Sequence, residues 1–173
     1  MIAQPTPAVR PSGRVSPTGG SESAPGWVWV ASSGAIGRAL AAGDLRLPVG
    51  RDGALLRVAA GERVACFAPD AQPGGGCFLA LGHVLPGGMT ADRDAVGRDW
   101  ACRPVAYPAA GRVPLAAVLD GALAGMGWGM SLPVGLMRLD GGSLDAIAAA
   151  LTEGEEPAMA FPPVRIASLV DAD

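Results

Sequence analysis

Apolar residues between Trp27 and Leu151 come in short runs that glycine and proline repeatedly interrupt. The chain has 26 glycines and 16 prolines among its 173 residues, so turn signals separate most of these runs. Short β-branched and aromatic runs bounded by turn residues are typical of strands, whereas a doubly wound sheet needs strands that alternate regularly with helices. The pattern predicts an α+β fold, a small mixed β-barrel of five or six strands with about three short helices.

The expected elements follow from the same turn signals. Ser32 and Ser33 offer an N-cap to a helix that Gly43 would end, and Pro114 fits the first turn of a second helix. Ser143 is the expected N-cap of a third helix with apolar residues on one side. The predicted strands are 27–31, 62–67, 77–85, 101–107 and 135–139, and the predicted helices are 33–42, 114–123 and 143–151.

The two ends of the chain differ in composition from its middle. Residues 1–25 are rich in proline, serine, threonine and glycine, and we expect a disordered N-terminal arm there. Residues 26–152 have the size of one domain with its own core. Residues 153–173 are expected to be a C-terminal tail, and apolar side chains leave open that it packs back on the domain. These side chains are Phe161, Val164, Ile166 and Leu169.

The net charge of −3 comes from the ends, because arginines and acidic residues are equal in number between Gly26 and Ala150. A neutral domain does not attract a phosphate backbone over long distances, so any nucleic-acid role must depend on a local pocket. No apolar run reaches the roughly 18–20 residues that cross a bilayer, and we expect neither a membrane partner nor a signal peptide. The chain has three cysteines, an odd number that does not suggest a set of disulfide bonds. We therefore expect a reducing compartment, the cytoplasm.

A series of short motifs runs in order along residues 27–151. A Trp-bearing strand leads into Ser32-Ser33 and a helix ending at Gly43; further on come a Gly-Arg pair and the run LLRVAAGERVACFAP. The segments are 27, 32–36, 43, 49–51, 55–69, 78–84, 102–107, 127–129 and 135–139. In order and spacing they resemble the bacterial EVE family, a branch of the PUA-like fold. The chain resembles a divergent member of that family, which implies a PUA-like barrel.

The departures from the family pattern fall on polar positions. The Arg-Asp-His of the family is replaced by Ser33-Gly34-Ala35, its His before Gly-Lys by Val49, and its Tyr-Tyr-Ser by Cys66-Phe67-Ala68. A glutamate near the end of the pattern is replaced by Arg138. The resemblance therefore implies the family's scaffold, with fewer of the groups that would hold a ligand.

Function enters through the same resemblance, which implies a non-catalytic module that recognises a modified nucleobase in DNA or RNA through an aromatic pocket. Trp27 and Trp128 are the expected aromatic walls, because a flat ligand gains about 1–3 kcal/mol by stacking on an aromatic side chain. Each is also open to interpretation as a core residue, since strand tryptophans in small barrels usually pack inward. Trp29 competes with Trp27 for the inward position.

Six further residues complete the expected nucleobase site. Ser32 and Ser33 lie between a strand and a helix, where they either bind a polar edge or cap the helix. Gly50 and Arg51 resemble the Gly-Lys of the family, and an arginine can contact phosphate or stack on a base, or remain a solvated loop charge. Phe67 and Pro69 mark the end of a strand at the expected barrel mouth. We expect Phe67 to line the pocket or belong to the core.

Catalytic and metal chemistry receive little support from the sequence. Cys66, Cys77, Cys102 and His83 equal a zinc ligand set in number, but they include no Cys-x-x-Cys element and lie in apolar runs. We therefore expect buried thiols, no metal and no cofactor. His83 is the only histidine and no G-x-S-x-G motif is present, so we predict that the protein is not an enzyme.

Two further interpretations stay open. Asp92, Asp94 and Asp99 alternate with Arg93 and Arg98, which indicates a solvated loop or an arm that closes over the pocket. The loss of histidine and tyrosine from the pocket positions favours an alternative function. In that alternative the chain is a degenerate EVE domain that acts as a protein-interaction or accessory module.

Overall fold

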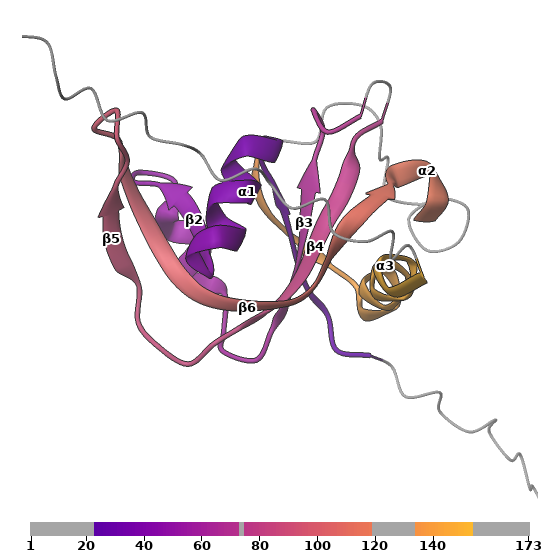
Figure 1. Ribbon diagram of the computed structural model, residues 1–173. Coiled ribbons are helices and arrows are strands. Elements are labelled where there is room, and N and C mark those ends of the chain that lie inside the picture. The colour runs from indigo at the N-terminus through magenta and orange to yellow at the C-terminus, as the bar shows by residue number, and fades with distance from the viewer. Residues whose placement is uncertain (1–22, 73–74, 119–133, 154–173) are drawn as a thin grey trace, which may run out of the picture.

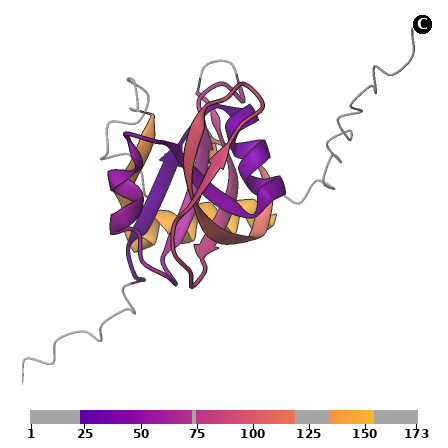
Figure 2. The ribbon, with the colours of Figure 1, turned by 90° about the vertical axis from the view of Figure 1, so that its left-hand side faces the viewer.

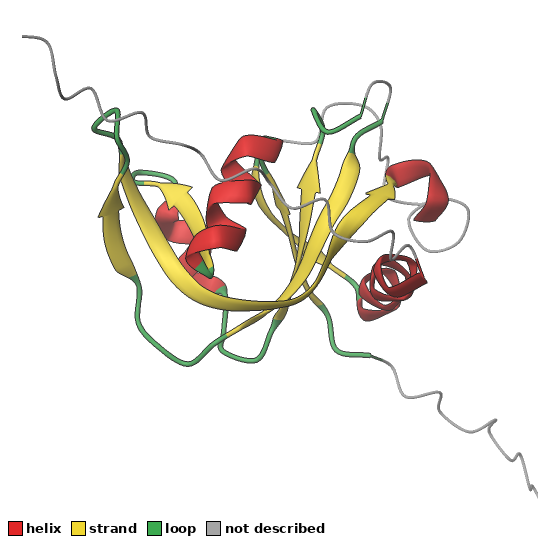
Figure 3. Ribbon diagram, viewed as in Figure 1, coloured by secondary structure: helices red, strands yellow, loops and turns green. Residues whose placement is uncertain are grey.

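The computed structural model describes residues 23–72, 75–118 and 134–153, which form one curled mixed sheet accompanied by a few helices (Figures 1 and 3). The strands are β1 (Gly26–Val30), β2 (Asp44–Pro48), β3 (Arg63–Ala68), β4 (Cys77–Val84), β5 (Thr90–Arg93), β6 (Asp99–Pro114) and β7 (Gly135–Leu139). The helices are α1 (Ser33–Ala42), the 3-10 helix η1 (Asp52–Arg57), α2 (Leu115–Val118) and α3 (Gly141–Glu153).

The order of strands across the sheet is β2-β6-β4-β3-β1-β7, and β5 pairs with β6 outside this path. β1 runs parallel to β3, and every other pair is antiparallel. Because β2 and β7 stand at the two ends of this order, each has one edge without a neighbouring strand among the described residues. We call the open side of the curled sheet between β2 and β7 the seam.

The long strand β6 produces the curl. Its first residues pair with β2 and β5, and the remainder, from Val105 onward, pairs with β4. The ladder with β4 shifts register between Phe78 and Ala80 and again between Leu81 and His83. Such bulges bend a strand and increase its twist, and β6 accordingly sweeps round the molecule in a wide curve (Figure 1).

One buried cluster lies inside the curl, where α1 and η1 pack against the sheet. Trp27 and Trp29 alternate with Val28 and Val30 along β1, and the two tryptophans face this inner cluster. Gly82 leaves the space that an aromatic ring fills, since a Cβ at this position would lie 2.7 Å from the ring of Tyr107. Large members of the inner cluster are Trp27, Trp29, Ile36, Leu45, Leu55, Val58, Val64 and Val105.

A second buried cluster lies on the outer side of the sheet, beneath α3. Val28 and Val30 from β1 meet Leu144, Ile147 and Leu151, which recur along one face of α3 at helical spacing. The remaining members come mostly from β3, β4, the end of β6 and α2: Ala65, Phe67, Phe78, Leu81, Val113, Leu115, Val118 and Leu139. The sheet is therefore buried on both faces over its central strands.

Most predicted elements are confirmed, and the sheet is larger than the sequence indicated. α1 and β7 match their predicted ranges, and Gly43 ends α1 in the left-handed conformation with φ 68°. β2 and β5 were not expected, and they bring the described strands to seven. The helix expected over 114–123 begins as α2, and its end, like most of the expected arm and tail, lies outside the described residues.

The start of α3 corrects one prediction. Ser143 is not the N-cap but the third residue of this helix, which begins at Gly141. Asp140 takes the capping role, because its Oδ1 accepts a hydrogen bond from the Ser143 N–H at 2.8 Å. The Ser143 hydroxyl donates to Oδ2 of the same carboxylate at 2.6 Å. A carboxylate is the better acceptor at a helix N-terminus, since it also carries a charge that the helix dipole favours.

Candidate functional site

A groove of about 240 Å³ opens at the seam of the sheet. Leu47 and Pro48 line it from β2, and residues 134–137 line it from β7 and the residue before it. η1 lies against both edge strands and contributes Ala54, while Arg51 comes from the turn before η1 (Figure 2). The groove is thus formed by segments that are far apart in sequence and meet only because the sheet curls.

The turn after β2 places Arg51 beside the groove. Gly50 has φ 93°, a conformation that side chains rarely adopt, and its N–H donates to Asp52 Oδ1 at 3.0 Å. The N–H of Arg51 donates to the carbonyl of Pro48 at 2.9 Å and closes the turn. Leu55 is fully buried beneath η1 and anchors the helix that follows. Gly50 therefore contributes backbone geometry, and Arg51 contributes the functional group.

The groove combines apolar walls with one cation. Its other lining side chains are leucine, proline, alanine, valine and methionine, which offer no charge and no hydrogen-bond donor. The Arg51 guanidinium is exposed and makes no hydrogen bond or ion pair with any residue in the described part of the chain. Such a site can hold a flat apolar or aromatic group that carries a negative charge at one end.

Trp27 is placed differently from Arg51, inside the sheet. It is only 5 % exposed, its indole N–H donates to Glu62 Oε2 at 2.7 Å, and the Arg138 guanidinium lies over its ring at 4.5 Å. Arg138 also donates to Glu62 Oε1 at 2.7 Å. Burial raises the pKa of Glu62, but the N–H groups of Ala59 and Trp27 and the Arg138 charge outweigh it and lower that pKa overall. The Arg138 guanidinium therefore covers the face of the Trp27 ring that would otherwise be open to a ligand.

The serines lie at the start of α1, away from the groove. The Ser32 hydroxyl caps α1 by accepting from the Ala35 N–H at 3.3 Å, as one of the two sequence interpretations predicts. Ser33 instead meets Asp70, whose carboxylate accepts from its backbone N–H at 2.7 Å and its hydroxyl at 3.1 Å. Pro69 precedes Asp70 and is exposed. These residues form one small polar cluster, separate from Arg51.

Phe67 lies on the opposite face of the sheet from Trp27. It is 2 % exposed and belongs to the outer cluster, where its ring lies 5.1 Å from that of Phe78. Because neighbouring residues of a strand point to opposite faces, Cys66 and not Phe67 shares the inner face with Trp27. Trp128 lies outside the described residues. Of the described candidates, only Arg51 lines the groove.

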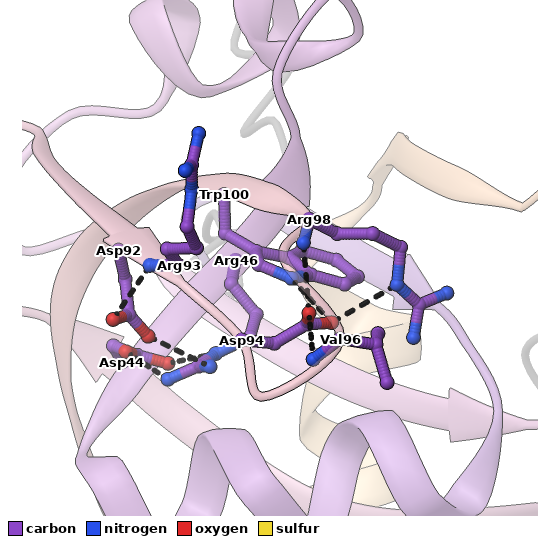
Figure 4. A network of polar contacts seen from close by, with 8 residues as sticks. All are labelled: Asp44, Arg46, Asp92, Arg93, Asp94, Val96, Arg98 and Trp100. Atoms are coloured by element: carbon purple, nitrogen blue, oxygen red, sulfur yellow. Dashed lines mark hydrogen bonds and ion pairs between the residues drawn. The ribbon is translucent and has the colours of Figure 1, made fainter.

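The hairpin of β5 and β6 corrects another expectation. Asp92 and Arg93 belong to β5 and Asp99 begins β6, so the expected loop is a hairpin in which only residues 94–98 form a turn, and that turn is mostly exposed to solvent. Asp94 organises the turn between them (Figure 4). Its carboxylate accepts from the N–H groups of Val96 at 3.1 Å and Arg98 at 2.9 Å, and also from the side chains of Arg98 and Trp100.

An arginine clamp ties the hairpin to β2. Arg46 is 7 % exposed, and its guanidinium contacts Asp44 at 2.5 Å and Asp92 at 3.3 Å (Figure 4). The hydrogen bond with Asp44 raises the pKa of Arg46, so this guanidinium stays charged throughout the usual pH range. Because the pairs hold β2 and β5 on either side of β6, we assign the clamp a structural role.

The sequence interpretation overlooked Trp100. It is half-buried, its indole N–H donates to Asp94 Oδ2 at 3.1 Å, and it lines a recess of about 370 Å³ with Arg98, Asp99, Pro48 and Val49. Pro48 also lines the seam groove, so the two hollows adjoin. The sequence feature that could have identified Trp100 is its position, at the end of a charged segment and directly before an apolar strand.

Among the described residues, no group of three metal-ligating side chains comes together. All three cysteines are buried and free, and burial raises the pKa of the Cys66 thiol to about 12. His83 is exposed on β4. Within the part of the chain that the structure describes, none of the cysteine thiols forms a hydrogen bond with His83.

Comparison of the sequence with protein-family models and with curated proteins finds no match. None of the helices in the described ranges has both the length and the apolar character that a membrane crossing requires.

Proposed function

We propose that this protein is a non-catalytic binding module, a divergent EVE-type domain with a PUA-like barrel that recognises a modified base in DNA or RNA. The curled mixed sheet and the order of its motifs support the barrel. The observation that carries the function is the seam groove, where apolar walls adjoin one arginine without a partner among the described residues.

In this proposal the base lies between β2 and β7 and the phosphate contacts Arg51. Leu47, Pro48 and Leu136 give the base an apolar environment that returns the stacking energy it loses on leaving a strand or duplex. The guanidinium presents several N–H donors in one plane, which suits two phosphate oxygens or one phosphate and a base edge. Trp27, Ser32, Ser33 and Phe67 support the fold around this site and do not touch the ligand.

The proposed affinity is modest because the domain is close to neutral. For a single strand, each phosphate contact adds roughly −0.7 to the slope of the logarithm of the binding constant against the logarithm of the salt concentration. One or two contacts therefore give a shallow salt dependence. Fluorescence anisotropy with labelled single-stranded DNA and RNA, carrying a central unmodified, methylated or hydroxymethylated base, measures this at two salt concentrations. We expect binding in the micromolar range and a preference for one modified base.

The deciding variant is Arg51→Ala, with Arg57→Ala as its matched control. Arg57 ends the same 3-10 helix, is exposed and does not line the groove. Loss of a charge-assisted contact weakens binding about tenfold, whereas Arg57→Ala leaves it unchanged. Equal effects of the two substitutions, or the absence of binding by every oligonucleotide at high protein concentration, would overturn the proposal.

A second candidate, a protein-interaction module, is favoured by three exposed valines: Val134 lines the groove, Val49 lines the recess and Val96 lies in the hairpin turn. Val49 is 58 % exposed, Val96 73 % and Val134 65 %. Exposed apolar side chains that gather near arginine and tryptophan are typical of protein contact surfaces. Sedimentation velocity over a range of protein concentrations tests self-association. This candidate requires an association that Val134→Asp abolishes and that Leu56→Asp, at another exposed apolar position, leaves intact.

A further inference from the structure

The β5–β6 hairpin holds its tryptophan in a fixed orientation. Asp94 accepts the indole N–H of Trp100 at 3.1 Å while the same carboxylate fixes the turn through the N–H groups of Val96 and Arg98. These hydrogen bonds lower the pKa of Asp94 to about 2, and the Arg98 N–H makes the largest contribution to this shift. The carboxylate is therefore charged at neutral pH. The Trp100 ring is thus held in place by its indole N–H while the ring itself is only half-buried.

Trp100 differs from the other described tryptophans in lacking a place in the core. Trp27 and Trp29 belong to the inner cluster, whereas Trp100 belongs to neither buried cluster and borders the recess beside the hairpin. The Arg98 guanidinium lies 5.8 Å from the centre of its ring, with its side chain 66 % exposed. An indole and a guanidinium together suit a flat base and the phosphate attached to it.

The recess continues the seam groove. Pro48 lines both the seam groove and the recess, so an extended ligand that crosses Pro48 reaches from the groove into the recess. Arg51 borders the first hollow and Arg98 the second, which places a cation beside each. The nearby carboxylates are already compensated, since Asp99 pairs with Arg93 at 2.7 Å and Asp94 with Arg98 at 3.0 Å. The contact with Asp94 uses only Nε of Arg98, so the two terminal nitrogens of this guanidinium have no hydrogen bond to any described residue.

We propose that Trp100 and Arg98 hold the nucleotide next to the base in the seam groove, so that the ligand is a single strand of at least two nucleotides. This inference rests on the proposed function and assigns it a second subsite. The base in the seam contacts apolar side chains, and its neighbour stacks on the free part of the indole. Since stacking tolerates every base, the second subsite adds affinity without reading sequence.

A length series tests the second subsite. Unlabelled mononucleotides, dinucleotides and trinucleotides that carry the preferred base are titrated into the wild type, Trp100→Ala and Trp100→Phe by isothermal calorimetry. We expect wild-type affinity to rise from mononucleotide to dinucleotide. Trp100→Ala should weaken the dinucleotide about tenfold and leave the mononucleotide unchanged, and Trp100→Phe should restore most of the loss, because a ring is still available for stacking.

Val96→Ala is the matched control, since it alters an exposed side chain of the same turn and keeps the backbone contact with Asp94. Chemical denaturation of each variant shows whether it is folded, and Trp100→Phe serves if Trp100→Ala is not. A mononucleotide that binds as tightly as a dinucleotide, with no effect of Trp100→Ala, would overturn the second subsite and leave the seam groove standing. No binding by any length would overturn both.

Discussion

Two tryptophans of this sheet have the same kinds of polar partner and differ in burial. At Trp27, the indole N–H binds Glu62 at 2.7 Å, and Arg138 pairs with that carboxylate while lying over the ring. The arrangement is held by β1, β7 and the start of β3, and the ring is 5 % exposed. The indole N–H and both carboxylate oxygens of Glu62 have partners within the protein, which is the condition for burying them, whereas the Arg138 side chain stays 55 % exposed.

At Trp100 the partners are Asp94 and Arg98, and the carboxylate again binds both the indole N–H and the arginine. Here all three residues lie on one hairpin, whose turn is exposed to solvent. Within the described part of the chain, Trp100 belongs to neither buried cluster and is half-buried, so part of its apolar surface stays accessible beside the Arg98 guanidinium. A shared polar motif therefore does not decide whether a tryptophan is buried, because topology places Trp27 in the core and Trp100 at the edge of a recess.

The largest expected effect separates the two tryptophans by stability. Trp27→Ala removes a buried ring from the inner cluster and should lower the free energy of unfolding by about 3–5 kcal/mol. Trp100→Ala should cost less than half of that, because its ring is only half-buried. Urea denaturation followed by far-UV circular dichroism measures both. Equal losses would show that Trp100 is a core residue after all.

A smaller effect is expected from the carboxylate that serves Trp27. Glu62→Gln removes the charge that Arg138 meets at 2.7 Å and leaves one oxygen for several donors, so the free energy of unfolding should fall by about 1–2 kcal/mol. The double variant Glu62→Gln, Arg138→Met removes both charges and should recover part of the loss. If the loss of free energy of unfolding in the double variant equals the sum of the losses in Glu62→Gln alone and Arg138→Met alone, the two residues do not act as a pair.

The smallest expected effect is local and depends on pH. The pKa of Asp94 is lowered from 3.8 to about 2, so its contribution to stability is complete above its unfolded value and is lost as pH falls from about 4 to about 2. The indole N–H signal of Trp100 in a two-dimensional NMR spectrum should move over that interval. In Asp94→Asn the movement should be absent. A Trp100 signal that already moves between pH 6 and 5, where carboxylates of ordinary pKa (about 4) are ionised, would contradict the hairpin geometry.

Local signals made part of the fold predictable from the sequence. The range of α1 follows from a serine cap and a terminal glycine, and β7 from a short apolar run between turn residues. The second half of β6 was missed because Pro108 and Gly111 resemble strand breakers, whereas bulges in the β4–β6 ladder accommodate this irregular strand. β2 was missed because Arg46 interrupts its apolar residues, and a buried arginine is accommodated here by Asp44 on the same strand together with Asp92 from a distant one.

The candidate site was predictable only in part. Gly50 and Arg51 were found from a local pattern, and they do adjoin the groove or its turn. The facing wall, residues 134–137, comes from the other edge of the sheet, and nothing in the local sequence indicates that it lies near Pro48. Trp27 and Phe67 illustrate the opposite case, because a motif alone does not specify which face of a sheet a side chain takes.

The central claim is that the ligand enters at the seam and not between the buried aromatic residues. Backbone amide shifts in a two-dimensional NMR titration with a dinucleotide carrying the preferred modified base test it directly. We predict that the shifts concentrate at residues 47–54 and 134–137, extend to 98–100, and spare Ser32, Ser33 and Phe67. Shifts centred on Ser32, Ser33 and Phe67 with none at the seam would contradict the account.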